Sequence, residues 1–187
     1  MAEPRNIWSF HGGLHLDDHK ETSSERPVQR MPLPERLVLP LHQHIGQSAE
    51  PVVAVGERVK KGQVVARATD YVSAPVHAPT SGQIVEIGDH PIPHPSGLSD
   101  SCIVIAADGE DSWGQMPEPM SDFHARSAAE LRERVRWAGI VGLGGAAFPT
   151  AVKVNTRGEH GIDTLILNAA ECEPYISCDD VLMREQA

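Results

Sequence analysis

The segment Val55-Gly-Glu-Arg-Val-Lys-Lys-Gly-Gln-Val-Val65, followed further on by Ala78-Pro-Thr-Ser-Gly-Gln-Ile84, decides the fold of the first half of the chain. Short β-branched runs alternate in it with glycine-containing turns, a pattern typical of brief strands. The same pattern continues on both sides. Six short strands are expected, at Arg36–Leu41, Pro51–Val55, Gln63–Thr69, Val76–Ala78, Gln83–Ile87 and Ser101–Ala106. This spacing predicts a small all-β sandwich or barrel.

These residues resemble lipoyl and biotinyl carrier domains, which have the barrel-sandwich hybrid fold. In such carriers the modified lysine lies at a hairpin tip, seven residues before the alanine of the Ala-Pro step. The corresponding position here is Tyr71, preceded by Thr69-Asp70. A phenol cannot form the amide that holds lipoate or biotin. The resemblance therefore implies the fold, with a structural or docking role in place of a swinging arm.

The composition excludes some classes of protein. Of the 187 residues, 40% are hydrophobic and 22% charged, as in a folded globular protein. The formal net charge of −10 makes nucleic acid a poor partner. The sequence shows no apolar run of the roughly 18 to 20 residues that span a bilayer and no secretion signal at its start. Three cysteines without CxxC spacing fit a reducing compartment.

A glycine-rich stretch stands in the second half, Trp137-Ala-Gly-Ile-Val-Gly-Leu-Gly-Gly-Ala-Ala-Phe-Pro-Thr150, with Lys153 shortly after it. Ser127 and Glu130 have capping-box spacing and Gly139 supplies a stop, so a helix is expected between them. A second helix is expected from Thr150. Because glycine lets a backbone approach a ligand closely, the stretch predicts a phosphate-binding loop with Lys153 as its cation. A plain glycine-rich turn between two helices is the alternative.

The run Thr164-Leu-Ile-Leu-Asn168 predicts a strand buried on both faces, as in a parallel sheet. Asn168-Ala-Ala-Glu-Cys-Glu-Pro-Tyr175 follows directly. Ligands of open α/β sheets lie outside the carboxyl ends of strands. Asn168, Glu171 and Glu173 are therefore candidates for hydrogen bonds to flavin, ribityl or ribose groups. Solvated loop acids are the alternative for the two glutamates.

The two motifs together, Gly142 to Lys153 and Asn168 to Pro174, resemble the FMN- and NADH-binding fold of the flavin subunit in respiratory complex I. A carrier-like barrel first, a flavin-type domain second and His-Gly-Gly near the start closely resemble the RnfC family, the C subunits of Rnf (Rsx) electron-transport complexes. The likeness implies a mixed fold. It places an N-terminal extension at 1–35, a barrel-sandwich hybrid domain at 36–107, a linker at 108–125 and the first part of an α/β FMN/NADH-binding domain at 126–187.

The resemblance also implies roles for individual residues. Gly142, Gly144, Gly145 and Lys153 would contact the FMN phosphate, and Asn168 and Glu171 would hold the flavin and its ribityl chain. Phe148 would stack on the adenine of NADH, and Glu173 would lie near the nicotinamide. No side chain in this set need act as an acid or base.

Three residues depart from the complex I pattern. Leu143 replaces an arginine, and Ala170 replaces an aspartate, which removes polar contacts with the cofactor. Tyr175 replaces the glycine that follows the proline, which narrows the expected pocket.

The Rnf family also implies two 4Fe-4S clusters, each held by four thiolates. Cys102, Cys172 and Cys178 cannot supply one, so no metal ligand is expected within these residues. The last residues, from Asp179 onward, predict a helix with acids in its first turn. We therefore expect a fragment of a longer chain, with the clusters in its missing part.

Two groups of histidines raise the question of a metal site. His11, His15 and His19 have i, i+4 spacing, but Gly12-Gly13 opposes a helix, so exposed loop histidines are favoured. His77, His90 and His94 lie in the proline-rich segment 75–95, which is expected to be a surface loop, with a metal site as the alternative.

The expected function is that of an NADH-oxidising FMN protein that passes electrons to iron–sulfur clusters, in exchange with ferredoxin and coupled to ion translocation. Its expected partners are NADH and the other subunits of a membrane complex. Its expected location is the cytoplasmic face of the bacterial inner membrane, as a peripheral protein. A related flavin or cobalamin reductase and a non-catalytic docking module are the alternatives.

Overall fold

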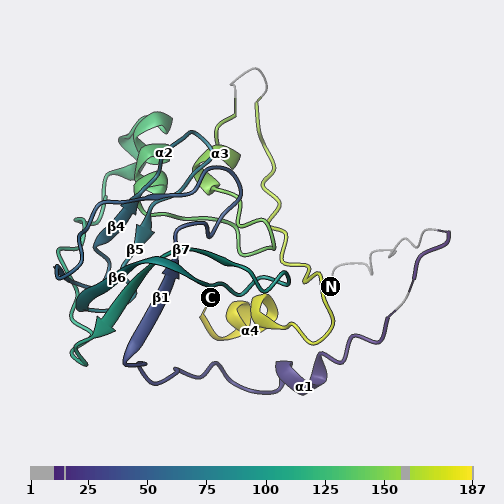
Figure 1. Cartoon of the computed structure of the whole chain (residues 1–187). Helices are drawn as coiled ribbons and strands as arrows, with labels where there is room; N and C mark the ends of the chain where they lie inside the picture. The colour runs from purple at the N-terminus through teal and green to yellow at the C-terminus, as the bar shows by residue number, and fades with distance from the viewer. Residues whose placement is uncertain (1–10, 15, 157–160, 187) are drawn as a thin grey trace. The chain divides into compact units, whose positions relative to one another are not determined.

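A computed structural model describes residues 11–14, 16–156 and 161–186 (Figure 1). The chain divides into two compact units. The larger unit is Pro32–Gly161, and the smaller one joins Met1–Met31 to Ile162–Ala187. Each unit is described by itself.

Two antiparallel sheets form the centre of the larger unit. The first has the strand order β1 (Arg36–Pro40), β7 (Ser99–Ala107), β6 (Gly82–Pro91) and β3 (Arg58–Val59). The second has the order β2 (Glu50–Pro51), β4 (Val64–Arg67) and β5 (Val76–His77). Strands β6 and β7 are the long neighbouring pair in Figure 1, and their register shifts between Ile84 and Glu86.

The core of this unit consists of aliphatic side chains from both sheets. Ile84, Ile103 and Ile105 from the first sheet and Val65 from the second are fully buried. They belong to one cluster with Leu41, Ala49, Val59, Ala66, Val76 and Ala78. Burial of branched side chains from two facing sheets is the main source of stability in such a sandwich.

The strand predictions are largely confirmed, with three differences. The predicted strand Pro51–Val55 is wrong for most of its length, because β2 shares only Pro51 with it. The two-residue strand β3 was not predicted, because Arg58–Val59 is too short to give a pattern. The prediction that 75–95 is a surface loop is wrong for His77, which lies in β5, and for His90, which lies in β6, but His94 is exposed in the turn after β6. Strand β6 continues to Pro91, which is opposite Ser99 of β7. A proline is tolerated there because β3, the other neighbour of β6, pairs with it at Gly82 and Gln83, at the opposite end of the strand.

Helix α2 (Ala128–Trp137) confirms the sequence prediction. The Ser127 hydroxyl accepts from the Glu130 N–H, and the Glu130 carboxylate accepts from the Ser127 N–H at 2.9 Å, which completes the capping box. Gly139 has φ +67° just after the helix. The predicted second helix is a single turn, α3 (Thr150–Lys153). A 3-10 turn, η1 (Phe123–Ala125), precedes α2.

Residues after β7 remain attached to the barrel. The Lys61 N–H donates to Ser112 O at 3.0 Å, and the Gly114 N–H donates to Lys61 O at 2.9 Å. Lys61 also forms an ion pair with Asp111 at 2.6 Å, and its ammonium lies 5.1 Å from the Trp113 ring centroid. The interval predicted as a linker therefore begins with residues fixed by the barrel.

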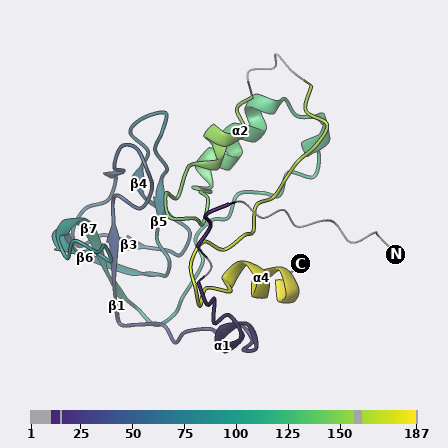
Figure 2. The same cartoon turned by 90° about the vertical axis from the view of Figure 1, so that its right-hand side faces the viewer.

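The smaller unit contains α1 (Glu21–Ser24) and α4 (Cys178–Gln186), which lie beside each other in Figures 1 and 2. The expected helix with Asp179 and Asp180 in its first turn is confirmed as α4. The predicted strand Thr164–Asn168 is wrong. Its central side chains, Leu165, Ile166 and Leu167, are 82%, 82% and 83% exposed. A strand buried on both faces needs paired neighbours, and within the described residues no strand pairs with this run.

Candidate functional site

Hydrogen bonds within the backbone close the glycine loop, residues 142–148 of the larger unit. The Gly142 N–H donates to Phe148 O at 2.9 Å, and the Ala147 N–H donates to Gly144 O at 2.9 Å. Below them, Val141 and Pro149 form an isolated antiparallel bridge. The loop is thus a small closed structure that ends at α3, and the half-buried Phe148 supplies the carbonyl that closes it.

Lys153 of α3 points back over this loop. A Cβ added at Gly142 would clash with Lys153 Nζ, so the ammonium would have to shift for any other residue at position 142. A Cβ at Gly144 or Gly145 would meet nothing within 4 Å. The loop is therefore open to a ligand at Gly144 and Gly145, and the Lys153 ammonium lies beside its first residue, Gly142.

The loop has the groups that an anion needs. Within the described part of the chain, the N–H groups of Leu143, Gly144, Gly145 and Ala146 donate to no protein acceptor. Consecutive unpaired N–H groups beside a lysine ammonium form a binding site for phosphate oxygens. These residues fit the phosphate of FMN, the group that the sequence predicts for this loop.

A hollow of about 820 Å³ in the larger unit reaches the glycine loop. Gly145 and Ala146 lie at its edge, and the barrel contributes His42, His44 and His94. The Ile45 N–H donates to Ala146 O at 2.9 Å and ties the loop to the barrel. The space beside the loop is large enough for part of a nucleotide.

His44 in this hollow is buried. Its Nε2 lies 2.9 Å from the Ala74 backbone nitrogen and 3.1 Å from Gln47 O, so the ring is held by the backbone on both sides. Burial lowers the pKa of His44, and the neighbouring His42 lowers it further, against a backbone hydrogen bond to Gln47 that raises it. His44 therefore fixes the barrel loop that borders the hollow.

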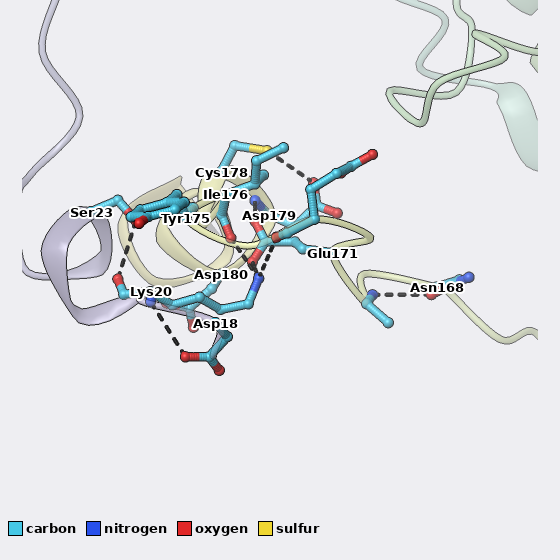
Figure 3. Close-up of polar contacts among 12 residues, drawn as sticks. Asp18, Lys20, Ser23, Asn168, Glu171, Tyr175, Ile176, Cys178, Asp179 and Asp180 are labelled. Carbon is cyan, nitrogen blue, oxygen red and sulfur yellow. Dashed lines mark hydrogen bonds and ion pairs between the residues drawn. The ribbon is translucent and has the colours of Figure 1, made fainter. Parts of the chain in front are cut away.

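The acidic loop, residues 168–175, lies in the smaller unit. Figure 3 shows its polar contacts. Asn168 is exposed, and its Oδ1 accepts from the Ala170 N–H at 3.0 Å in a local turn. Glu173 is exposed, and its backbone carbonyl lies 3.4 Å from Lys20 Nζ. Both side chains are accessible to a ligand.

Glu171 is engaged by the protein itself. Its side chain is only 7% exposed. One carboxylate oxygen accepts from the Asp179 N–H at 2.8 Å, at the start of α4, and the other lies 3.5 Å from Lys20 Nζ (Figure 3). Sequence reasoning missed the contribution of Lys20, since no pattern links two residues so far apart in the chain.

The candidate residues fall into two sets. Gly142, Gly144, Gly145, Phe148 and Lys153 belong to the larger unit, whereas Asn168, Glu171 and Glu173 belong to the smaller one. The structure brings residues together within each set. That the two sets bind one ligand stays a prediction.

The hairpin tip of the barrel carries a different kind of contact. Tyr71 lies between β4 and β5, and its hydroxyl accepts from Asn155 Nδ2 at 2.7 Å. Arg136 of α2 donates to Tyr71 O at 3.0 Å. The position that holds a modified lysine in carriers is thus used here to attach the segment after the barrel.

The two histidine groups gain no support as metal sites. No group of three or more potential ligands lies close enough to hold a metal ion among residues 11–14, 16–156 and 161–186. His15 lies outside the described residues. His19 stacks on Tyr175, with ring centroids 5.0 Å apart.

The two-sheet barrel and the glycine loop that follows it define the class of protein, a barrel-sandwich hybrid domain followed by a flavin-type domain. Comparison with known proteins agrees. Residues 8–110 match the family "RnfC Barrel sandwich hybrid domain", and residues 135–187 match "Nuo51 FMN-binding domain". The chain belongs to the RnfC family.

Relatives named as the C subunit of an ion-translocating oxidoreductase complex match almost the whole chain. The Pseudomonas aeruginosa protein is 54% identical over 97% of this chain and 23% of its own length. The Rhodobacter capsulatus protein is 47% identical over 100% of this chain and 36% of its own length. The Serratia proteamaculans protein is 50% identical over 97% of this chain and 25% of its own length. The chain therefore spans about a quarter to a third of the length of these relatives.

Proposed function

We propose that this chain is part of the C subunit of an ion-translocating electron-transport complex, and that the whole protein oxidises NADH through FMN. The observation that carries the proposal is the glycine loop, inside the segment similar to an FMN-binding domain. Lys153 lies over Gly142 in this loop, and four of its N–H groups donate to no acceptor among the described residues. Electrons would pass to iron–sulfur clusters and exchange with ferredoxin, coupled to ion translocation.

The residues take the following roles in this proposal. Gly142, Gly144, Gly145 and Lys153 bind the FMN phosphate through N–H groups and one positive charge. Asn168 and Glu171 hold the flavin and ribityl chain, Phe148 stacks on the NADH adenine, and Glu173 faces the nicotinamide. FMN, when bound, supplies the chemistry, because it accepts a hydride and releases single electrons.

Glu171 contributes to such a site in a specific way. One carboxylate oxygen accepts from the Asp179 N–H and the other faces Lys20. A ribityl hydroxyl would donate to the lone pairs that these contacts leave free. The aliphatic Leu143 and Ala170 add no polar group. Binding therefore depends strongly on the phosphate end of the cofactor.

The remaining parts of the proposal concern domains, partners and location. The proposed domains are an N-terminal extension at 1–35, the barrel-sandwich hybrid domain at 36–107, a linker at 108–125 and the first part of the FMN/NADH-binding domain at 126–187. A 4Fe-4S cluster needs four thiolates, and this chain has three cysteines, so the clusters would be held by further residues of the parent protein. Other subunits of the complex and NADH are its partners, at the cytoplasmic face of the inner membrane. In the described part of the chain, the helices are all too short or too polar to cross a bilayer.

A docking module is the second candidate, because Tyr71 at the hairpin tip binds Asn155 and Arg136 of the same unit. The test is to purify the full-length parent protein and measure bound flavin and NADH oxidation. Bound FMN with NADH-dependent bleaching of its absorbance supports the proposal. A protein without flavin that cannot be reconstituted with FMN would favour the docking module.

A further inference from the structure

The segment Asp18–Val28 of the smaller unit is attached to the acidic loop and to α4 along its whole length. At one end the Tyr175 N–H donates to Asp18 O at 2.7 Å. At the other, Arg184 of α4 donates to Ser24 O at 2.8 Å, and the Val28 N–H donates to the Glu185 carboxylate at 3.0 Å. We call this segment the N-terminal clasp.

Lys20 is the charged centre of the clasp. Its ammonium donates to Ile176 O at 2.7 Å and lies 3.4 Å from Glu173 O and 3.5 Å from the Glu171 carboxylate (Figure 3). One side chain thus binds three points of the loop that follows Asn168. The Glu171 side chain is almost fully buried, and a buried carboxylate is costly unless it has partners, so the Lys20 ammonium beside it is a stabilising contact.

Tyr175 shows that the loop depends on the clasp. Its φ of +67° is in the left-handed region, which a residue with a Cβ adopts only when its surroundings impose it. The surroundings are clasp residues. Asp18 accepts from its N–H, the Ser23 hydroxyl donates to its carbonyl, and the His19 ring stacks on its own.

We infer that Lys20 is a positioning residue for the flavin-binding loop, and that the N-terminal clasp sets the conformation of Glu171–Tyr175. This inference rests on the proposed function, because it assigns the loop to the same FMN site. Lys20 forms an ion pair with one Glu171 carboxylate oxygen, and the other oxygen accepts from the Asp179 N–H in the first turn of α4. Loss of the ammonium would leave the buried Glu171 carboxylate without its ion-pair partner and release the strained turn at Tyr175.

The test compares Lys20→Met with Lys20→Arg and with a matched control, Arg26→Met, in the full-length protein. Arg26 is a basic, exposed residue of the same clasp, and its side chain forms no hydrogen bond or ion pair with the described residues. Hydrogen exchange is followed at the Tyr175 and Asp179 amides, and the FMN dissociation constant is measured by flavin fluorescence.

Lys20→Met is expected to speed exchange at both amides by about tenfold and to weaken FMN binding by about tenfold, as for a lost charged hydrogen bond. Lys20→Arg retains much of both properties, and Arg26→Met changes neither. Unchanged exchange in Lys20→Met overturns the inference, as does faster exchange with unchanged FMN affinity. A wild-type protein that binds no FMN sinks the proposed function, and amide exchange then still decides whether Lys20 holds the loop.

Discussion

The guanidinium of Arg136 lies 5.4 Å from the ring centroid of Tyr71, over the residue that replaces the modified lysine of carrier domains. The same guanidinium donates to the Tyr71 carbonyl. Arg136 belongs to α2 and Tyr71 to the hairpin tip between β4 and β5, which lie close together in Figures 1 and 2. The barrel therefore serves as a base for the helix that precedes the glycine loop.

Tyr71→Ala should destabilise this attachment. It removes the cation–π contact and the hydrogen bond from Asn155, which together are worth about 1 to 2 kcal/mol. Tyr71→Phe removes the hydrogen bond alone and should cost about 0.5 to 1 kcal/mol. Urea unfolding of the three proteins measures the difference. Equal stability of wild type and Tyr71→Ala would show that the contact does not support the unit.

Gly139→Ala should be more damaging than an ordinary glycine substitution. A Cβ there would lie 2.9 Å from Pro75 O and 3.0 Å from the His77 ring, in addition to its strain at φ +67°. The expected loss is about 1 to 3 kcal/mol in the free energy of unfolding. Gly97→Ala is the control, because Gly97 has φ +66° but open space around its Cβ. Gly139→Ala should lose more free energy of unfolding than Gly97→Ala, by the cost of the clash. Similar losses in the two variants would show that the clash does not affect stability.

The barrel should lose stability as the pH falls below neutrality. Burial lowers the pKa of His44, so the unfolded chain takes up a proton more readily than the folded one. The stabilising effect is complete above the ordinary histidine pKa of about 6.5 and declines as the pH falls toward the folded value. Urea midpoints between pH 7.5 and 5.5 should fall in wild type and fall less in His44→Gln. Parallel slopes would contradict this assignment.

A second pH effect is expected at the segment after β7. The Lys61 ammonium beside Asp111 lowers the pKa of that carboxyl, and the Ser81 hydroxyl lowers the pKa of Asp108. Both carboxylates stabilise the folded state fully above their unfolded pKa of about 3.9. This stabilisation is lost as the pH falls through their lower folded pKa values. The indole N–H resonance of Trp113 should therefore titrate below pH 4, and Asp111→Asn should remove most of the change. An unchanged titration in that variant would exclude Asp111 as its source.

Local patterns predicted those elements whose cause is local. The capping box of Ser127 and Glu130, the stop at Gly139 and the turn-separated strands of the barrel depend on neighbouring residues, and the structure has them. The run Leu165–Leu167 has the composition of a buried strand, but burial requires pairing partners that its own residues cannot specify. Lys20 escaped prediction for the same reason, because its partners lie about 150 positions away.

The central claim is that the glycine loop and Lys153 bind the phosphate of FMN, and a comparison of FMN with riboflavin tests it most directly. The dissociation constants of both flavins are measured for the wild-type protein and for Lys153→Met. Wild type should prefer FMN, and Lys153→Met should weaken FMN binding by about tenfold while riboflavin binding stays the same, because the lost interaction is a charged contact to phosphate. Equal affinities for the two flavins in wild type, or a parallel loss of both in Lys153→Met, would contradict the claim.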